Sequence, residues 1–262
     1  RFAFATSDNA TDVGNLTRGS YAQGSFASET HGYVGGGEYG PSSTRVEKFS
    51  FATGSEDAST VFDGYGDSNA HQQGAAGSHS EIAGYLMAGG DSTSNDISKI
   101  TFASDGSSAG WGDLTTASGA ASGSSSLTHG YTAHNNSLTI DKFPFASDGG
   151  AVDWGDVTVA RATPWGASSS THGYTIGGDS TTPSIVDRFL FSSDAGSSDV
   201  GDLATDRDQA AGQSSATHGY SSTGGYSATN MIEKVSFESG GNSVDSNQDV
   251  TSARRWAAGT EY

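Results

Sequence analysis

Six tyrosines recur along the chain at nearly constant spacing, and this repeat constrains the fold more than any other feature. They are Tyr33, Tyr85, Tyr131, Tyr174, Tyr220 and Tyr262, and the gaps between them are 52, 46, 43, 46 and 42 residues. Four of them close a His-Gly-Tyr triplet, which begins at His31, His129, His172 and His218. A period of this length indicates one supersecondary unit copied in tandem. We therefore expect the recurring residues to build the repeat, and function to lie where the copies differ.

Each copy has the pattern of short strands. The segments between turn residues alternate in polarity and end in Gly, Ser or Asp, which is typical of strands joined by tight turns. No window carries apolar residues at helical spacing, so almost no helix is expected. Four short antiparallel strands in a unit of about 40–50 residues is the pattern of a β-propeller blade. The tyrosine motif is expected to form the first strand of each blade.

An apolar pair at i, i+2 marks the next strand of every copy and predicts the face that packs on the neighbouring blade. The pairs are Phe2/Phe4, Phe49/Phe51, Ile100/Phe102, Phe143/Phe145, Phe189/Phe191 and Val235/Phe237. A base stands before each pair, and an acid often precedes the base, as in Glu47, Asp141, Asp187 and Glu233. These charges predict an outward-facing ladder of ion pairs rather than a functional ring of cations.

The two ends of the chain predict how the ring closes. Residues 259–262 align with the tyrosine motif, whereas the first strands of the chain lack a tyrosine strand of their own. The prediction is a single all-β domain over residues 1–262, a six-bladed propeller with four short antiparallel strands per blade. Its units are roughly 31–80, 81–128, 129–171, 172–217 and 218–258, and a composite blade is built from 259–262 plus 1–30. Because the chain begins at Arg1, it is expected to be processed, trimmed or a fragment.

Composition excludes several classes of partner and site. The net charge is −18, from 30 acidic and 12 basic residues. Nucleic acid and anionic membranes would be repelled by this charge, so neither is expected as a partner. The absence of cysteine excludes disulfides and thiolate metal sites. No apolar run approaches 18 residues, so membrane insertion is not expected.

The repeat resembles the kelch repeat, which implies a β-propeller. The kelch-like features are the paired glycines after the tyrosine, as at Gly177-Gly178, a tryptophan at Trp111 and Trp154, and an arginine at Arg161, Arg207 and Arg254. The third copy departs, with Thr132 to Asn136 in place of the glycine pair. The amino-acid sequence of the repeats also resembles repeat tracts in predicted virion and tail-fibre proteins of marine bacteriophages, which implies an extracellular or virion-surface location.

Repeated histidines and acids are candidate metal ligands, but a structural role is the better interpretation. Equivalent positions in different blades are too far apart for one ion unless they line the axis. We therefore expect the four repeated histidines to form hydrogen bonds between strands. The repeated acids Asp67, Asp113, Asp156, Asp202 and Asp249 are expected to make turns, with Ca²⁺ binding as an alternative. No cofactor is expected.

An enzyme is the rival class. The turn Ser104-Asp105-Gly106 resembles the Asp box of sialidase-like propellers, although its spacing differs, and Arg161, Arg207 and Arg254 could supply the arginines that a sialidase needs. A glycosidase or lyase acting in the central cleft therefore stays open as an alternative. Because the arginines follow the repeat, a structural role is preferred and no catalytic residue is assigned.

Aromatic residues that break the repeat are the candidate ligand-binding groups, since exposed aromatics on loops anchor sugars and protein partners. The candidates are Trp165, Trp256, Tyr39, Tyr65 and His71. The predicted function is a non-enzymatic binding or adhesion module that presents propeller loops to a cell-surface glycan or protein. Self-association, or assembly with other virion subunits, is an alternative, as is a purely structural virion or filament subunit.

Overall fold

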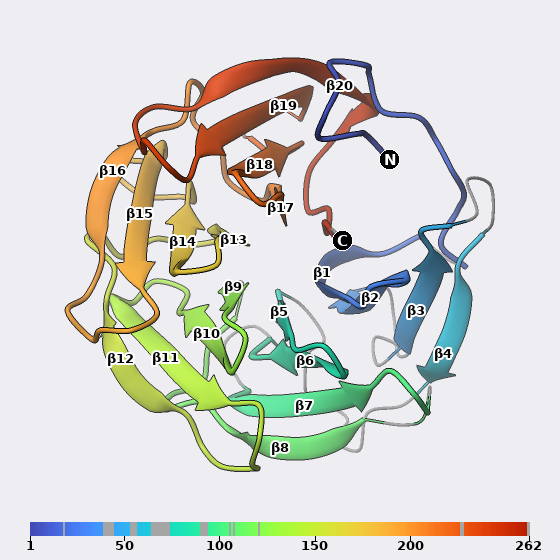
Figure 1. Cartoon of the computed structure of the whole chain (residues 1–262), viewed down its shortest axis with the longest axis vertical. Coiled ribbons are helices and arrows are strands. Elements are labelled where there is room, and N and C mark those ends of the chain that lie inside the picture. Colours follow the sequence, from blue (N-terminus) through green and yellow to red (C-terminus); the bar gives the residue numbers. More distant parts are fainter. Residues whose placement is uncertain are drawn as a thin grey trace.

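The chain folds as an all-β propeller, seen along its axis in Figure 1. The computed structural model describes residues 1–17, 19–38, 45–52, 57–63, 74–89, 94–104, 106, 108–119, 121–225 and 228–260. These residues form five antiparallel sheets of four strands each, arranged around a central channel. Within them no helix is long and apolar enough to cross a membrane.

The five sheets follow one another along the chain, each with its strands in sequence order from the axis outwards. The first holds β1 (Tyr21–Ala27), β2 (His31–Glu38), β3 (Arg45–Ser50) and β4 (Ser59–Asp63). The second holds β5 (Ala76–His79), β6 (Ala83–Met87), β7 (Asp96–Thr101) and β8 (Ala109–Asp113). The third holds β9 (Ser122–Ser125), β10 (His129–Ala133), β11 (Thr139–Pro144) and β12 (Val152–Asp156). The fourth holds β13 (Trp165–Ser168), β14 (His172–Ile176), β15 (Ile185–Leu190) and β16 (Ser198–Asp202). The fifth holds β17 (Ala211–Ser214), β18 (His218–Ser222), β19 (Thr229–Ser236) and β20 (Val244–Arg254).

The tyrosine motif forms the second strand of each sheet, not the first as the sequence suggested. The innermost strand is the short polar segment before it, such as Ala211–Ser214, which pairs with His218–Ser222. Small and polar residues face the axis there, so this strand carries little of the apolar alternation by which strands are recognised. The aromatic pair belongs to the third strand, and its second member follows the strand end.

The prediction of six blades is wrong, because the described residues form five sheets. The composite blade does not form: residues 1–17 and 256–260 lie between the fifth and first sheets as irregular chain without a strand ladder. They still pack on both neighbours. Phe4 stacks on Tyr220 with ring centroids 4.7 Å apart, and Ser25 Oγ donates to the carbonyl of Gly259 at 2.7 Å.

Aromatic stacking joins each of the first four sheets to the sheet that follows it, as the i, i+2 pairs predicted. The tyrosine of one sheet stacks on the second aromatic of the following sheet. The centroid distances are 5.1 Å for Tyr33–Phe102 and 4.7 Å for Tyr85–Phe145, Tyr131–Phe191 and Tyr174–Phe237. Because these rings are shared between sheets, much of the apolar burial depends on neighbouring blades being present together.

Glycine in the innermost strands allows those strands to approach one another closely. A Cβ on Gly123 would collide with the backbone carbonyl of Gly77, and a Cβ on Gly166 with that of Gly123. The same relation links Gly212 to Gly166. The width of the channel is therefore set by contacts between backbones.

Candidate functional site

The structure places the five sequence-predicted site residues in different surroundings. Trp165 opens β13 and is 4% exposed, packed in the core with Tyr174. Trp256 follows β20, is half-buried and lines the central channel. Tyr39, Tyr65 and His71 lie outside the described residues. Both tryptophans therefore line the channel, but Trp165 is buried in the core packing between sheets and Trp256 is the more exposed of the two.

The central channel is a cavity of about 290 Å³ enclosed by the five innermost strands and residues 256–260. Most of its wall is Gly, Ala and Ser, so backbone groups and hydroxyls face the axis. One end, here called the upper rim, is formed by Ala22 at the start of β1, by Gly74, Thr163 and Gln209 before β5, β13 and β17, and by Trp256 after β20. The other end, the lower mouth, is formed by the turns that follow those strands.

The upper rim is a ring of residues with left-handed backbone conformation. The φ angles are 58° at Ala22, 69° at Gly74, 51° at Thr163, 55° at Gln209 and 60° at Trp256. Backbone hydrogen bonds run around this ring from Gly74 N to Ala22 O (2.8 Å), Gln209 N to Thr163 O (3.3 Å), Trp256 N to Gln209 O (2.9 Å) and Ala22 N to Trp256 O (3.1 Å). A positive φ is strained for a β-branched or bulky residue. Such strain is often kept at binding sites, where surrounding contacts hold it.

The side chains around this ring are unequal although their backbones are equivalent. On one side stand the hydroxyl of Thr163, the amide of Gln209 and the indole of Trp256; on the other stand Ala22 and Gly74. Thr163 Oγ1 and Gln209 Oε1 are buried and have no hydrogen-bond partner among the described residues. The rim thus combines an aromatic surface with unpaired polar atoms, and buried polar atoms are normally paired.

Asp208 supplies negative charge beneath this side of the rim. The residue is 3% exposed, and its Oδ2 accepts a 2.7 Å hydrogen bond from Gln209 Nε2. Burial raises the pKa of Asp208 and the neighbouring Asp179 raises it further, while a backbone hydrogen bond and Arg255 oppose the shift. The hydrogen bond holds the Gln209 amide with its oxygen free, so Asp208 orients the group that a ligand would meet.

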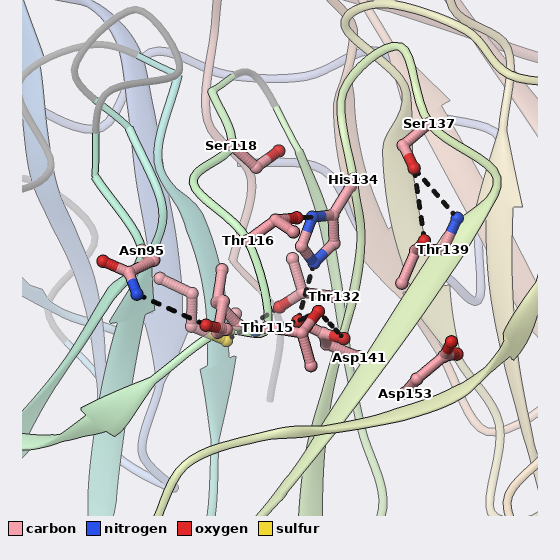
Figure 2. A network of polar contacts seen from close by, with 12 residues as sticks. Asn95, Thr115, Thr116, Ser118, Thr132, His134, Ser137, Thr139, Asp141 and Asp153 are labelled. Carbon is pink, nitrogen blue, oxygen red and sulfur yellow. Dashed lines mark hydrogen bonds and ion pairs between the residues drawn. The ribbon is translucent and has the colours of Figure 1, made fainter.

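A second candidate lies between the second and third sheets and resembles a catalytic relay (Figure 2). Exposed Thr116 lies with Oγ1 3.1 Å from His134 Nδ1, and His134 Nε2 lies 2.8 Å from Asp141 Oδ2. Hydroxyl, imidazole and carboxylate in this order are the components of nucleophilic catalysis. Asp141 also accepts hydrogen bonds from the backbone N–H and hydroxyl of Thr115.

Comparison with the next two sheets assigns this network a structural role. Asp187 accepts from Arg161 Nη2 at 2.7 Å, and Glu233 accepts from Arg207 Nη2 at 3.0 Å. Each of these acids also accepts a backbone N–H from the preceding sheet. We call Glu47, Asp141, Asp187 and Glu233 the inter-sheet carboxylates; they are 4%, 0%, 0% and 0% exposed. The prediction of an outward ion-pair ladder is wrong for these acids, which are buried. Asp141, Asp187 and Glu233 lie between sheets, and Glu47 lies against Thr17 of the N-terminal segment.

His134 is thus the hydrogen-bond partner of the buried Asp141, a role that Arg161 fills for Asp187 and Arg207 for Glu233. It follows β10 directly, where Gly177 follows β14, and the arginine position in the preceding loop is Ser118. These two departures are coupled, because the imidazole lies where a guanidinium would otherwise be needed. In the sequence, His134 was marked only by the missing glycine pair and the missing arginine of the third copy. The three-dimensional contact between His134 and Asp141 is what shows that these two departures are related.

The arginine set does not form an oxyacid-binding site. Arg161 and Arg207 are each buried against a different carboxylate, and Arg254 is exposed with hydrogen bonds to Ser252. The repeated histidines also stay apart: each Nδ1 lies 2.8 Å from the hydroxyl of the preceding threonine, in Thr30–His31, Thr128–His129, Thr171–His172 and Thr217–His218. Among the described residues no group of three His, Cys, Asp or Glu side chains could hold a metal ion.

A scan against models of protein families finds no match, and no curated protein is significantly similar to the chain. The β-propeller arrangement therefore rests on the sheets themselves, and any function must be argued from the site.

Proposed function

We propose that this propeller is a non-enzymatic binding module that takes a carbohydrate at the upper rim of its channel. The observation that carries the proposal is the asymmetry of the rim, where Thr163, Gln209 and Trp256 face Ala22 and Gly74. A sugar ring presents an apolar face to an aromatic side chain and hydroxyls to amide and hydroxyl groups. The small residues opposite leave room for the ring.

Each group has a defined role in this proposal. The indole of Trp256 forms the stacking surface for the sugar ring. Gln209 Oε1 accepts a hydrogen bond from a sugar hydroxyl, because its amide nitrogen is already engaged by Asp208. Thr163 Oγ1 can donate or accept. An extracellular or virion surface is the proposed setting, in keeping with the resemblance of the repeats to tail-fibre proteins.

A glycan array followed by titration of the best ligand tests this function. Trp256→Ala should weaken binding roughly tenfold or more, as expected for a central aromatic contact, while Trp256→Phe should retain part of the affinity. Trp154→Ala is the matched control, because it removes an indole from the outer strand β12. Circular dichroism confirms that each variant is folded. Equal loss in the two alanine variants, or no glycan bound by the unaltered protein, would refute the proposal.

A further inference from the structure

The lower mouth of the channel opens into a separate cavity of about 460 Å³. It is bounded by the turns after β1, β5, β9 and β13. Glu29 and Glu81 occupy equivalent places in adjacent turns, and Leu127 occupies the next place around the ring. No Lys or Arg is among the described residues that line it. The mouth therefore has negative charge on one side and an apolar side chain on the other.

The first serine of each of these turns already donates its hydroxyl to the backbone. Ser28 Oγ donates to His31 O at 3.4 Å and Ser80 Oγ to Ala83 O at 3.2 Å. Ser126 and Ser169 make the same contact in their turns. Consequently the protons of these four serines are not available to a ligand, and Glu29 and Glu81 are the charged acceptors in these turns. Neither carboxylate has an ion-pair partner among the described residues.

His79 supplies a third acceptor at the junction of the two cavities, since it lines both the channel and the lower mouth. It closes β5 at the position held by Ser125, Ser168 and Ser214 in the next three sheets. Its ring has no hydrogen-bond partner among the described residues. Burial lowers the pKa of His79, so the imidazole is neutral near pH 7 and one ring nitrogen can accept a hydrogen bond.

We propose that the lower mouth binds the cationic side chain of a lysine or arginine from a partner polypeptide. The ammonium or guanidinium group donates to Glu29, Glu81 and His79, and its aliphatic stem packs against Leu127. A polypeptide fits better than a free amine, because Leu127 is 86% exposed and Ile82 beside Glu81 is 65% exposed. These apolar side chains extend the contact beyond the charged group. The net charge of −18 favours the approach of a basic partner.

Fluorescence anisotropy with a labelled Leu-Lys-Leu peptide, blocked at both ends, tests the proposal. The same peptide with norleucine in place of lysine is the ligand control. Glu29→Gln and Glu81→Gln should each weaken lysine-dependent binding by roughly 2- to 5-fold, in the range of partly exposed ion pairs. Glu238→Gln makes the same change of charge at an exposed turn after β19 and should leave binding unchanged.

Two further measurements make the result decisive. Leu127→Ala should weaken the peptide but not n-butylamine, and raising the salt concentration should weaken the lysine peptide alone. Equal binding of the lysine and norleucine peptides would overturn the proposal. So would an effect of Glu238→Gln as large as that of Glu81→Gln. Because this site lies at the opposite end of the channel from Trp256, either site can fail without the other.

Discussion

Removing the guanidinium of Arg207 should destabilise the propeller more than any single surface change. Arg207 is 1% exposed, and it donates hydrogen bonds to Thr205 Oγ1 at 3.0 Å, Thr223 O at 2.9 Å, Met231 O at 3.0 Å and Glu233 Oε1 at 3.0 Å. Arg207→Ala leaves the buried carboxylate of Glu233 without its countercharge. Breaking a buried ion pair in this way costs about 3–5 kcal/mol.

The expected change in melting temperature follows from the size of the chain. For domains of this order, 1 kcal/mol corresponds to a shift of about 2–4 °C, so Arg207→Ala should melt roughly 6–20 °C lower. Differential scanning calorimetry, with urea unfolding as a second probe, measures the change. Arg207→Met combined with Glu233→Leu should recover much of the loss, because it removes both charges together.

The chain carries its own control at Arg254. This arginine holds the same place in the repeat, but it is exposed and its side chain donates hydrogen bonds to Ser252 rather than to a buried carboxylate. Arg254→Ala should therefore shift the free energy of unfolding by no more than about 0.5 kcal/mol. If Arg207→Ala and Arg254→Ala melted within a degree of each other, the structural role assigned to the inter-sheet carboxylates would be refuted.

Two other changes test the packing and the electrostatics. Gly166→Ala should lower the free energy of unfolding measured in urea by about 1–3 kcal/mol or more, because the new Cβ would collide with the carbonyl of Gly123. Gly149→Ala is the control and should be nearly neutral, because nothing lies within 4 Å of its Cβ. Equal effects of the two substitutions would contradict the close packing. Asp208→Asn should stabilise the protein near pH 7 by on the order of 1 kcal/mol, because burial raises the pKa of Asp208 above its ordinary 3.8 and its carboxylate form therefore destabilises the fold increasingly as the pH rises through that range. Calorimetry across pH 3–8 should show this gain in stability vanishing at the acidic end. A gain that stayed constant with pH would contradict the assignment.

The aromatic repeat predicted the propeller but not the number of sheets. Phe2 and Phe4 carry the same i, i+2 signal as the third-strand pairs, and Phe4 stacks on Tyr220 as its counterparts do on theirs. The pattern therefore reports where an aromatic packs. It does not report whether the backbone around it finds a hydrogen-bonded neighbour, and residues 1–17 find none in a ladder.

The candidate site was only partly predictable, for a similar reason. Trp256 was identified because it breaks the repeat, and the structure places it at the channel. Trp165 breaks the repeat equally, yet it is buried, because the absent Cβ of Gly212 in the next sheet leaves room for its indole; a Cβ there would lie 2.8 Å from the ring. Such long-range accommodation has no local signal. Gln209 and Thr163 likewise had no recognisable signal in the sequence, because their importance comes from backbone strain and unpaired side-chain atoms.

The close packing of the innermost strands has a consequence for how this scaffold can evolve. Because contacts between glycine backbones fix the width of the channel, a substitution on the channel wall cannot widen the channel without breaking the ring of sheets. The residues at either end are free of that constraint, as the variety of side chains at Ala22, Thr163, Gln209 and Trp256 illustrates. A new ligand can therefore be accommodated by exchanging a few end residues, while the diameter of the passage is inherited unchanged.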